Sequence, residues 1–263
     1  MLVAALDTAT LTLSCALVDV VPGEAPRLRC DRTVVTGGRS PAARAAMAPG
    51  SRPRSHSAEL PQALVDLLTA EGLAIPDLDG YAVGLGPGSF TGLRIGLATW
   101  KGLAYANRRP IAGGSSLAAM ALAAAPDAED GAVLVPLLDA RKGEVYAGFY
   151  RVRAGGIVET SDDAALSPSA LGERLVALAE GGARPVVFGE GLDAYAAALA
   201  GVPRLATSVV TPPASAVAAV VAESLATAAY DAQALFALEP HYVRASEAEM
   251  KFPKGLGPGA DER

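Results

Sequence analysis

A glycine-rich run at residues 84–96 is the strongest candidate for chemistry in this 263-residue chain. It reads Gly-Leu-Gly-Pro-Gly-Ser-Phe-Thr-Gly-Leu-Arg-Ile-Gly, follows a short apolar segment at 81–83, and opens into a predicted helix. Glycine permits positive φ and close backbone approach, and a helix N-terminus capped by Ser89 or Thr91 presents free N–H groups to an anion. The run is therefore a candidate phosphate site.

The run nevertheless matches no established phosphate-binding pattern. A Gly-Lys-Ser/Thr triplet at P-loop spacing is missing, and Ser89 and Thr91 stand where the dinucleotide-binding pattern requires its third glycine. A G-x-S-x-G nucleophile elbow is also missing. These observations favour a structural turn that fixes a helix against a sheet, with phosphate binding as the alternative.

Two aspartates and two histidines complete the set of candidate catalytic side chains. Asp7 and Asp139 each end a predicted apolar strand, where a carboxylate either faces a cleft or caps the turn that follows. His56 and His241 are far apart in sequence, which excludes a paired-histidine zinc site within one chain. His56 is interpreted as a polar residue at the start of a helix. The alternative is that it acts as a catalytic base, although the sequence shows no evident partner for it.

Composition narrows the class of protein. Hydrophobic residues make up 51% of the chain, and 22 basic against 28 acidic residues give a net charge of −6. This balance argues against a dedicated nucleic-acid-binding surface, although it does not exclude contact with RNA through one local patch. No apolar run reaches membrane-spanning length and no signal peptide is evident, so we expect a soluble cytoplasmic protein without a membrane partner. Cys15 and Cys30 form no ligand-spaced cluster and are expected to be reduced thiols.

The chain contains two similar halves that must position these side chains. Each half opens with an apolar strand that ends in aspartate, followed by a turn and a returning strand. This repetition predicts a duplicated two-lobe α/β architecture, with an N-terminal lobe at 1–107 and a C-terminal lobe at 108–214. A further helix at about 215–230 is expected to pack back onto the first lobe.

Two segments are expected to be flexible. Residues 37–54 combine glycine, proline, alanine and serine with four arginines and no acidic residue. We expect a solvated loop there, with contact to RNA or an acidic partner as the alternative. Residues 251–263 are rich in proline, glycine and charge, and are expected to be a flexible tail.

Five segments of this chain occur in an order that resembles a known family. They are Leu6-Asp7-Thr8-Ala9-Thr10, His56-Ser57-x-x-Leu60-Pro61, the glycine run from Gly86 to Gly96, Asp139-Ala140-Arg141-Lys142-Gly143-Glu144-Val145-Tyr146, and Pro240-His241-Tyr242-Val243-Arg244. This layout is similar to that of the TsaB (YeaZ) family of bacterial tRNA threonylcarbamoyladenosine biosynthesis proteins, and the similarity covers nearly the whole chain.

The resemblance implies a two-lobe actin-like ATPase fold, that is, a duplicated ribonuclease H-like (ASKHA) fold. It also implies a non-catalytic role beside TsaD, the subunit that transfers the threonylcarbamoyl group to adenosine 37 of tRNA. TsaD-like relatives carry a metal-binding His-x-x-x-His, and Ser116 and Met120 stand in those positions here. The resemblance therefore implies no catalytic residue, no metal and no cofactor of its own, with ATP or ADP only at the interface with TsaD. A vestigial nucleotide site is predicted at Asp7, Thr8, Gly88, Ser89 and Asp139.

The resemblance further implies partners and the surface that binds them. The partners are a TsaD-type transferase, a TsaE-type ATPase and a second copy of the chain, with tRNA reached only through the complex. The predicted contact surface lies on the helices at about 57–71 and 89–107 and consists of Leu60, Leu64, Leu67, Leu68, Leu93, Leu97, Trp100 and Lys101. The alternative is that these leucines face the sheet of their own lobe.

Two rival functions predict different behaviour. A nucleotide-dependent small-molecule kinase of the same superfold needs a phosphate-gripping first turn, and residues 7–10 contain no glycine. A metallopeptidase needs the metal-binding histidines that Ser116 and Met120 replace.

Overall fold

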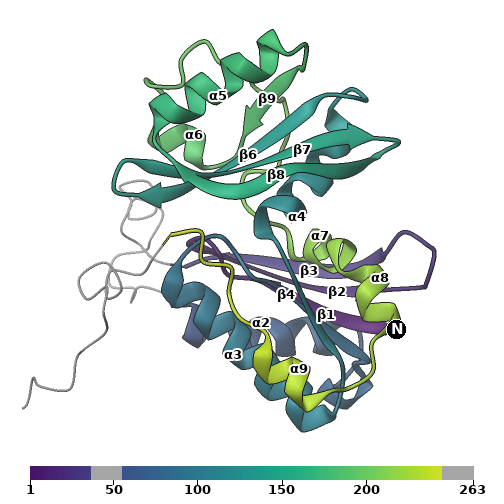
Figure 1. Cartoon of the computed structure of the whole chain (residues 1–263). Coiled ribbons are helices and arrows are strands. Elements are labelled where there is room, and N and C mark those ends of the chain that lie inside the picture. Colours follow the sequence, from purple (N-terminus) through teal and green to yellow (C-terminus); the bar gives the residue numbers. More distant parts are fainter. Residues whose placement is uncertain (37–54, 245–263) are drawn as a thin grey trace, which may run out of the picture.

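The computed structural model describes residues 1–36 and 55–244. The predicted arginine-bearing loop at 37–54 and the predicted tail at 251–263 lie outside these residues. The chain forms two stacked α/β lobes, each built on its own sheet (Figure 1). In the described part of the chain, no helix is long and apolar enough to cross a membrane.

The first lobe is built on a five-stranded sheet with the order β3-β2-β1-β4-β5. β1, β2 and β3 form an antiparallel meander, whereas β4 and β5 run parallel to β1. The strands are β1 (Leu2–Asp7), β2 (Thr12–Asp19), β3 (Arg27–Val35), β4 (Gly80–Gly84) and β5 (Ile111–Gly114).

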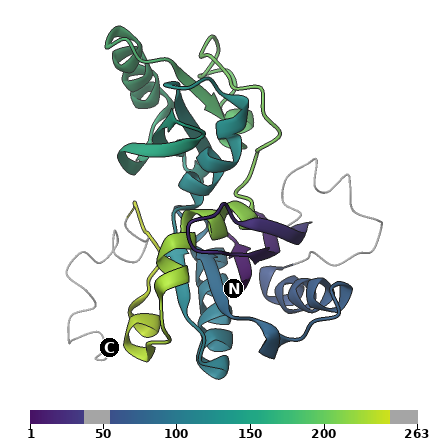
Figure 2. The same ribbon diagram turned by 90° about the vertical axis from the view of Figure 1, so that its right-hand side faces the viewer.

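Helices cover both faces of this sheet, so β1 is buried along its whole length. Leu2, Ala4 and Leu6 of β1 point to the side of α2 (His56–Ala70) and α3 (Phe90–Asn107). The alternate residues, Val3 and Ala5, point to the side of α7 (Ala214–Val220) and α8 (Ala222–Thr227). The helix region predicted at about 215–230 is thus two short helices, and α7 packs against β1, β2 and β4. The short α9 (Ala232–Ala237) lies against α3 (Figures 1 and 2).

The second lobe repeats the strand arrangement of the first. Its sheet has the order β8-β7-β6-β9, with β6, β7 and β8 as an antiparallel meander and β9 parallel to β6. The strands are β6 (Val133–Arg141), β7 (Glu144–Arg153), β8 (Gly156–Leu166) and β9 (Pro185–Phe188). This matches β3-β2-β1-β4 strand for strand, so the predicted duplicated two-lobe fold is confirmed.

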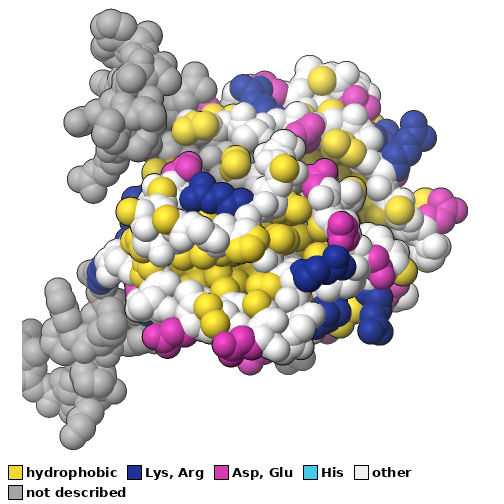
Figure 3. All heavy atoms as spheres, turned by 90° about the horizontal axis from the view of Figure 1, so that it is seen from above, with side chains coloured by type: hydrophobic (Ala, Val, Ile, Leu, Met, Phe, Trp, Pro, Cys, Tyr) yellow, Lys and Arg dark blue, Asp and Glu magenta, His cyan; other side chains and the backbone are white. Residues whose placement is uncertain are grey.

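Two layers cover the second sheet. α4 (Ser116–Ala124) packs on the side of the first lobe, where it contacts both α7 and β6. α5 (Pro168–Glu180) and the short α6 (Gly191–Ala194) lie on the outer side. Seen from that side, apolar side chains form a band across the face, with charged side chains beside it and at the rim (Figure 3). Short 3-10 turns at Ile75–Asp77 and Ala125–Asp127 complete the described elements.

Serine side chains start the four longest helices. In each helix the N-cap hydroxyl accepts a hydrogen bond from a backbone N–H of the first turn, which satisfies a donor that has no partner inside the helix. The caps are Ser55 for α2, Ser89 for α3, Ser115 for α4 and Ser167 for α5. The glycine run and the start of α4 are thereby held in defined positions at the face between the lobes.

The predicted lobe boundary at 107/108 requires a correction. β5 lies beyond this boundary, yet it pairs with β4 in the first sheet, where Ile111 lies opposite Tyr81. The first lobe therefore extends to Gly114. The strand was missed because it has only four residues, two of them glycine.

The predicted partner surface also requires a correction. All seven of its apolar side chains are at most 6% exposed in this chain: Leu60, Leu64, Leu67, Leu68, Leu93, Leu97 and Trp100. Six of them pack with β1, β2 and β4, and Leu93 joins a cluster shared by both lobes. Lys101 is half-buried, and its Nζ donates to the carbonyl of Phe236 at 3.0 Å. Helical periodicity located the apolar face correctly, but the sheet of the same lobe covers it.

Candidate functional site

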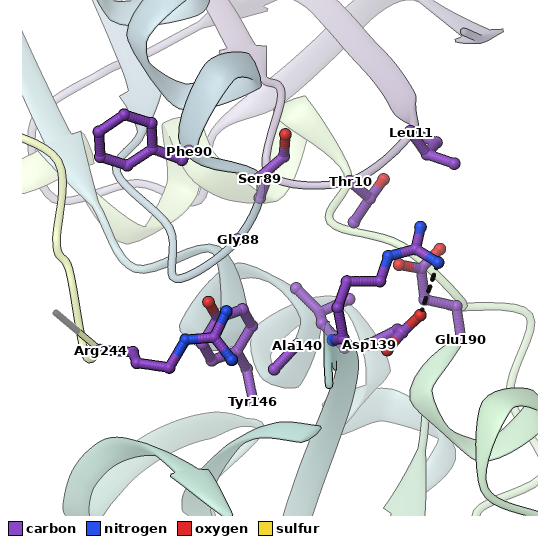
Figure 4. Close-up of a pocket in the computed structure, with 13 residues that line it drawn as sticks. Thr10, Leu11, Gly88, Ser89, Phe90, Asp139, Ala140, Tyr146, Glu190 and Arg244 are labelled. Carbon is purple, nitrogen blue, oxygen red and sulfur yellow. Dashed lines mark hydrogen bonds and ion pairs between the residues drawn. The ribbon is translucent and has the colours of Figure 1, made fainter. Parts of the chain in front are cut away.

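A pocket of about 310 Å³ lies where the two lobes face each other (Figure 4). From the first lobe, the turn between β1 and β2 and the start of α3 line it. From the second lobe, the end of β6, Tyr146 of β7 and Glu190 line it. Arg244, from the C-terminal end of the described chain, forms part of the same wall.

The glycine run lies directly against the turn that follows β1. A Cβ atom on Gly88 would overlap the carbonyl of Ala9, and one on Gly92 would overlap the carbonyl of Thr8. The backbone N–H of Ser89 donates to Ala9 at 2.6 Å, and the Thr8 hydroxyl donates to the Gly92 carbonyl at 2.9 Å. The glycines are therefore required for close packing of α3 on this turn. The N–H and hydroxyl of Ser89 are both used within the chain, which favours the structural interpretation of the run.

Asp7 lies behind the pocket. Its carboxyl group is fully buried and accepts hydrogen bonds from the Ser116 hydroxyl at 2.6 Å and from the Ala9 N–H at 2.8 Å. Burial raises the pKa of Asp7 to about 6, because the charged form loses its hydration. A carboxylate with both oxygens engaged in the interior is suited to holding two segments together.

The predicted vestigial nucleotide site is divided by the fold. Gly88, Ser89 and Asp139 line the pocket, whereas Asp7 and Thr8 are fully buried and do not line it. The Asp7 carboxyl group points inward and reaches Ser116 at the start of α4. The corresponding aspartate of the second lobe, Asp139, faces the pocket instead.

The second-lobe wall of the pocket carries two carboxyl groups, Asp139 and Glu190, beside the guanidinium group of Arg141. Asp139 forms an ion pair with Arg141 at 3.0 Å and accepts a hydrogen bond from the Arg141 N–H at 2.8 Å. Burial, and next the charge of Asp139, raise the pKa of Glu190 to about 7. Glu190 follows β9, the second-lobe counterpart of β4, so the duplication itself could have predicted that it faces the pocket.

The start of α4 connects buried carboxyl groups of both lobes. Ser116 donates to Asp7 of β1, and the neighbouring Ser115 donates to Asp163 of β8 at 2.7 Å. The Tyr150 hydroxyl donates to the other oxygen of Asp163 at 2.7 Å, and burial raises the pKa of Asp163. Within residues 1–36 and 55–244, no group of three or more His, Cys, Asp or Glu could hold a metal ion.

The two histidines do not contribute to the pocket wall. His56 is buried at the start of α2, where its Nδ1 lies 2.8 Å from the Thr36 hydroxyl, and burial lowers its pKa. His241 is exposed, and its backbone N–H donates to the carbonyl of Leu85 at 2.8 Å. His56 is thus placed as the polar helix-start residue that the sequence indicates.

An aromatic strip, defined here as Phe90, Arg94, Tyr105, Phe236 and Tyr242, covers the exposed side of α3 and the neighbouring C-terminal segment. Its four rings are between 40% and 62% exposed. The Arg94 guanidinium lies 3.8 Å from the centre of the Phe90 ring, and its Nε donates to the Tyr242 hydroxyl at 2.9 Å. The Tyr105 and Phe236 rings lie 5.6 Å apart. Exposed rings that cluster in this way are typical of a contact surface.

Two lobes that share a four-strand order, and a pocket between them lined by the turn after β1, the end of β6 and Glu190 after β9, define the actin-like ATPase class of folds. Within this class, residues 44–252 match the family model described as TsaD, tRNA N6-adenosine threonylcarbamoyltransferase. The match covers most of the chain, and the chain belongs to this family.

Relatives and solved structures refine the position within the family. The tRNA threonylcarbamoyladenosine biosynthesis protein TsaB of Escherichia coli is 38% identical over 125 residues, which are 47% of this chain and 53% of that protein. TsaB of Bacillus subtilis is 38% identical over 110 residues, 42% of this chain and 47% of that protein. The chain thus spans about half the length of these curated relatives. YeaZ from Pseudomonas aeruginosa has a similar structure, with a TM-score of 0.65, 26% identity, and coverage of 92% of this chain and 99% of that one. The predicted resemblance to TsaB and YeaZ is confirmed.

Proposed function

We propose that this chain is a non-catalytic subunit of the bacterial machinery that makes N6-threonylcarbamoyladenosine at position 37 of tRNA. In this role it binds and activates a TsaD-type transferase and acts with a TsaE-type ATPase. The observation that carries the proposal is that α4 contains no histidine; we interpret its Ser116 and Met120 as standing where TsaD-like relatives carry their metal-binding histidines. The Ser116 hydroxyl donates a hydrogen bond to Asp7, and Met120 belongs to an apolar cluster. Neither side chain replaces an imidazole as a metal ligand.

The turn after β1 gives no support to the rival kinase function. Many phosphoryl-transfer enzymes hold phosphate oxygens with the free backbone N–H groups of a tight turn. In this turn, the N–H of Ala9 donates to Asp7, and the carbonyl of Ala9 accepts from Ser89. The N–H of Ala9 is therefore already used within the chain.

We place the partner surface on the aromatic strip, on the exposed side of the helix whose leucines were predicted to make the contact. Large rings and an arginine are the side chains that contribute most to binding energy at interfaces. Both the transferase and a second copy of this chain are proposed to bind there, so the homodimer and the heterodimer compete for one surface. tRNA is then contacted only through the assembled complex, in the cytoplasm.

We propose no cofactor bound by this chain alone. The pocket wall carries the carboxyl groups of Asp139 and Glu190 beside the guanidinium groups of Arg141 and Arg244, so it offers a triphosphate no net positive charge when all four are ionised. ATP or ADP is instead proposed at the interface with the transferase.

The test is co-purification with the cognate TsaD-type protein, followed by a tRNA modification assay with and without this chain. We expect modification to require both proteins, and this chain alone to give none. Unchanged modification in its absence would refute the activator role, and modification by this chain alone would identify it as the transferase.

A matched pair of variants tests the surface. Tyr105→Ala combined with Phe236→Ala removes two exposed rings that contact each other. We expect at least a tenfold loss of affinity for the transferase, since two ring truncations at an interface centre cost about 2 kcal/mol or more. Val176→Ala, at an equally exposed position on α5, is the control and should leave binding unchanged. Equal binding by both variants would place the contact elsewhere.

A further inference from the structure

The segment after α9 begins in the core of the first lobe. Leu235 of α9 is buried there, and Leu238 packs against the same cluster of side chains. The Lys101 ammonium of α3 donates to the carbonyl of Phe236 at 3.0 Å. The start of the segment is therefore fixed to α3 by apolar packing and by a charge-assisted hydrogen bond.

The middle of the segment follows the glycine run. The N–H of His241 donates to the carbonyl of Leu85 at 2.8 Å, in the turn between β4 and α3. The Tyr242 ring lies 5.2 Å from the Phe90 ring, and its hydroxyl accepts from Arg94. These contacts direct the chain toward the pocket.

The end of the segment reaches the second lobe. Val243 packs against a cluster that combines Leu93 of α3 with Leu138 and Tyr146 of the second sheet. Arg244 forms an ion pair at 3.0 Å with Glu144, the first residue of β7, and the two side chains are only 26% and 36% exposed. Arg244 also lines the pocket, beside Tyr146 (Figure 4).

We propose that residues 238–244 form a strap that fixes the two lobes to each other and holds one wall of the pocket, with the Arg244–Glu144 pair as its attachment. Within the described residues, the chain itself passes between the lobes at α4 and between β9 and α7. Two lobes joined in this way can rotate about their connections. The strap adds a non-covalent link beside the pocket and restrains that rotation. This role does not depend on which partner the chain binds, so the inference goes beyond the proposed function.

The experiment is hydrogen–deuterium exchange of the full chain in Arg244→Ala, in Glu144→Ala and in the double variant. We expect each single change to speed exchange of the peptide covering 139–146 by about fivefold, since partly buried ion pairs contribute modestly to local stability. The double variant should add nothing further, because both changes break one interaction. The exchanged pair, Arg244→Glu with Glu144→Arg, should restore slow exchange. Arg29→Ala breaks an ion pair to Asp19 in the first sheet and is the control.

Three outcomes would overturn the strap. These are wild-type exchange at 139–146 in Arg244→Ala, additive effects of the two single changes, and failure of the exchanged pair to restore protection. If Arg244→Ala speeds hydrogen exchange throughout the chain, the charge-swapped double variant decides whether the ion pair is responsible. Its protection can return only if the two swapped side chains pair again.

Discussion

The buried carboxyl of Asp7 makes the stability of this fold depend on pH, and Asp7→Asn should remove that dependence. The carboxyl accepts hydrogen bonds from Ser116 and Ala9 and has no ion-pair partner among the described residues. An asparagine side chain fits the same space. Its oxygen can accept from Ala9, and its amide can donate to the Ser116 hydroxyl.

The magnitude follows from the pKa. Burial raises the pKa of Asp7 from 3.8 to about 6, a difference of about 2 units, and at 1.36 kcal/mol per unit this gives about 3 kcal/mol. Because the folded pKa lies above the unfolded one, the neutral carboxyl stabilises the fold fully below about pH 4. That contribution is lost as the pH rises through about 6. The asparagine variant should therefore gain stability relative to the natural chain, by up to about 3 kcal/mol, between pH 4 and pH 8.

The assay is urea denaturation at several pH values, followed by the fluorescence of Trp100, the single tryptophan, which is fully buried. Asp31→Asn is the control, because Asp31 is an exposed aspartate on β3. The quantity of interest is the difference in the free energy of unfolding between variant and natural chain. If that difference changes by less than about 0.5 kcal/mol between pH 4 and pH 8, the assignment of Asp7 is wrong.

Two further predictions concern packing and hydrogen bonding in the first lobe. Gly92→Ala should destabilise the fold by about 2 kcal/mol or more, because its Cβ would overlap the Thr8 carbonyl, whereas Gly102→Ala on the same helix meets open space and should stabilise it by up to about 1 kcal/mol. Thermal melting of both variants checks this, and similar shifts in melting temperature would contradict it. Trp100→Phe should cost about 1–3 kcal/mol in denaturation followed by circular dichroism, because the buried Ala4 carbonyl loses the indole N–H that donates to it at 2.9 Å. An unchanged midpoint would mean that another donor replaces the indole.

The sequence predicted the fold well because the relevant signals are local. A strand that ends in aspartate, then a turn and a returning strand, occurs twice, at Asp7 and at Asp139, and the two sheets repeat that order. The pocket was only partly predictable, since its wall combines residues that are distant in sequence. Glu190 could be expected there only by comparing β9 with its counterpart β4, and Arg244 faces the pocket because of where the C-terminal segment ends, which no spacing within that segment reveals.

The apolar side chains predicted to form the partner surface are buried in this chain, and the sequence could not show this for a different physical reason. Periodicity identifies which side of a helix is apolar, but not whether the covering element belongs to the same chain. Leu64 and Leu97 were assigned to a partner and are covered by the first sheet. The exposed rings of Tyr105 and Phe236 break no periodic pattern and gave no signal.

The paired serines at the start of α4 have a consequence for how the chain unfolds. Ser116 satisfies a buried carboxyl of the first lobe, and Ser115 satisfies one of the second. If one lobe opened and α4 moved with it, Asp7 or Asp163 would lose one of its two donors while it remained buried in the other lobe. Local unfolding of one lobe is thereby penalised by the other, and the two halves are expected to melt in a single cooperative transition.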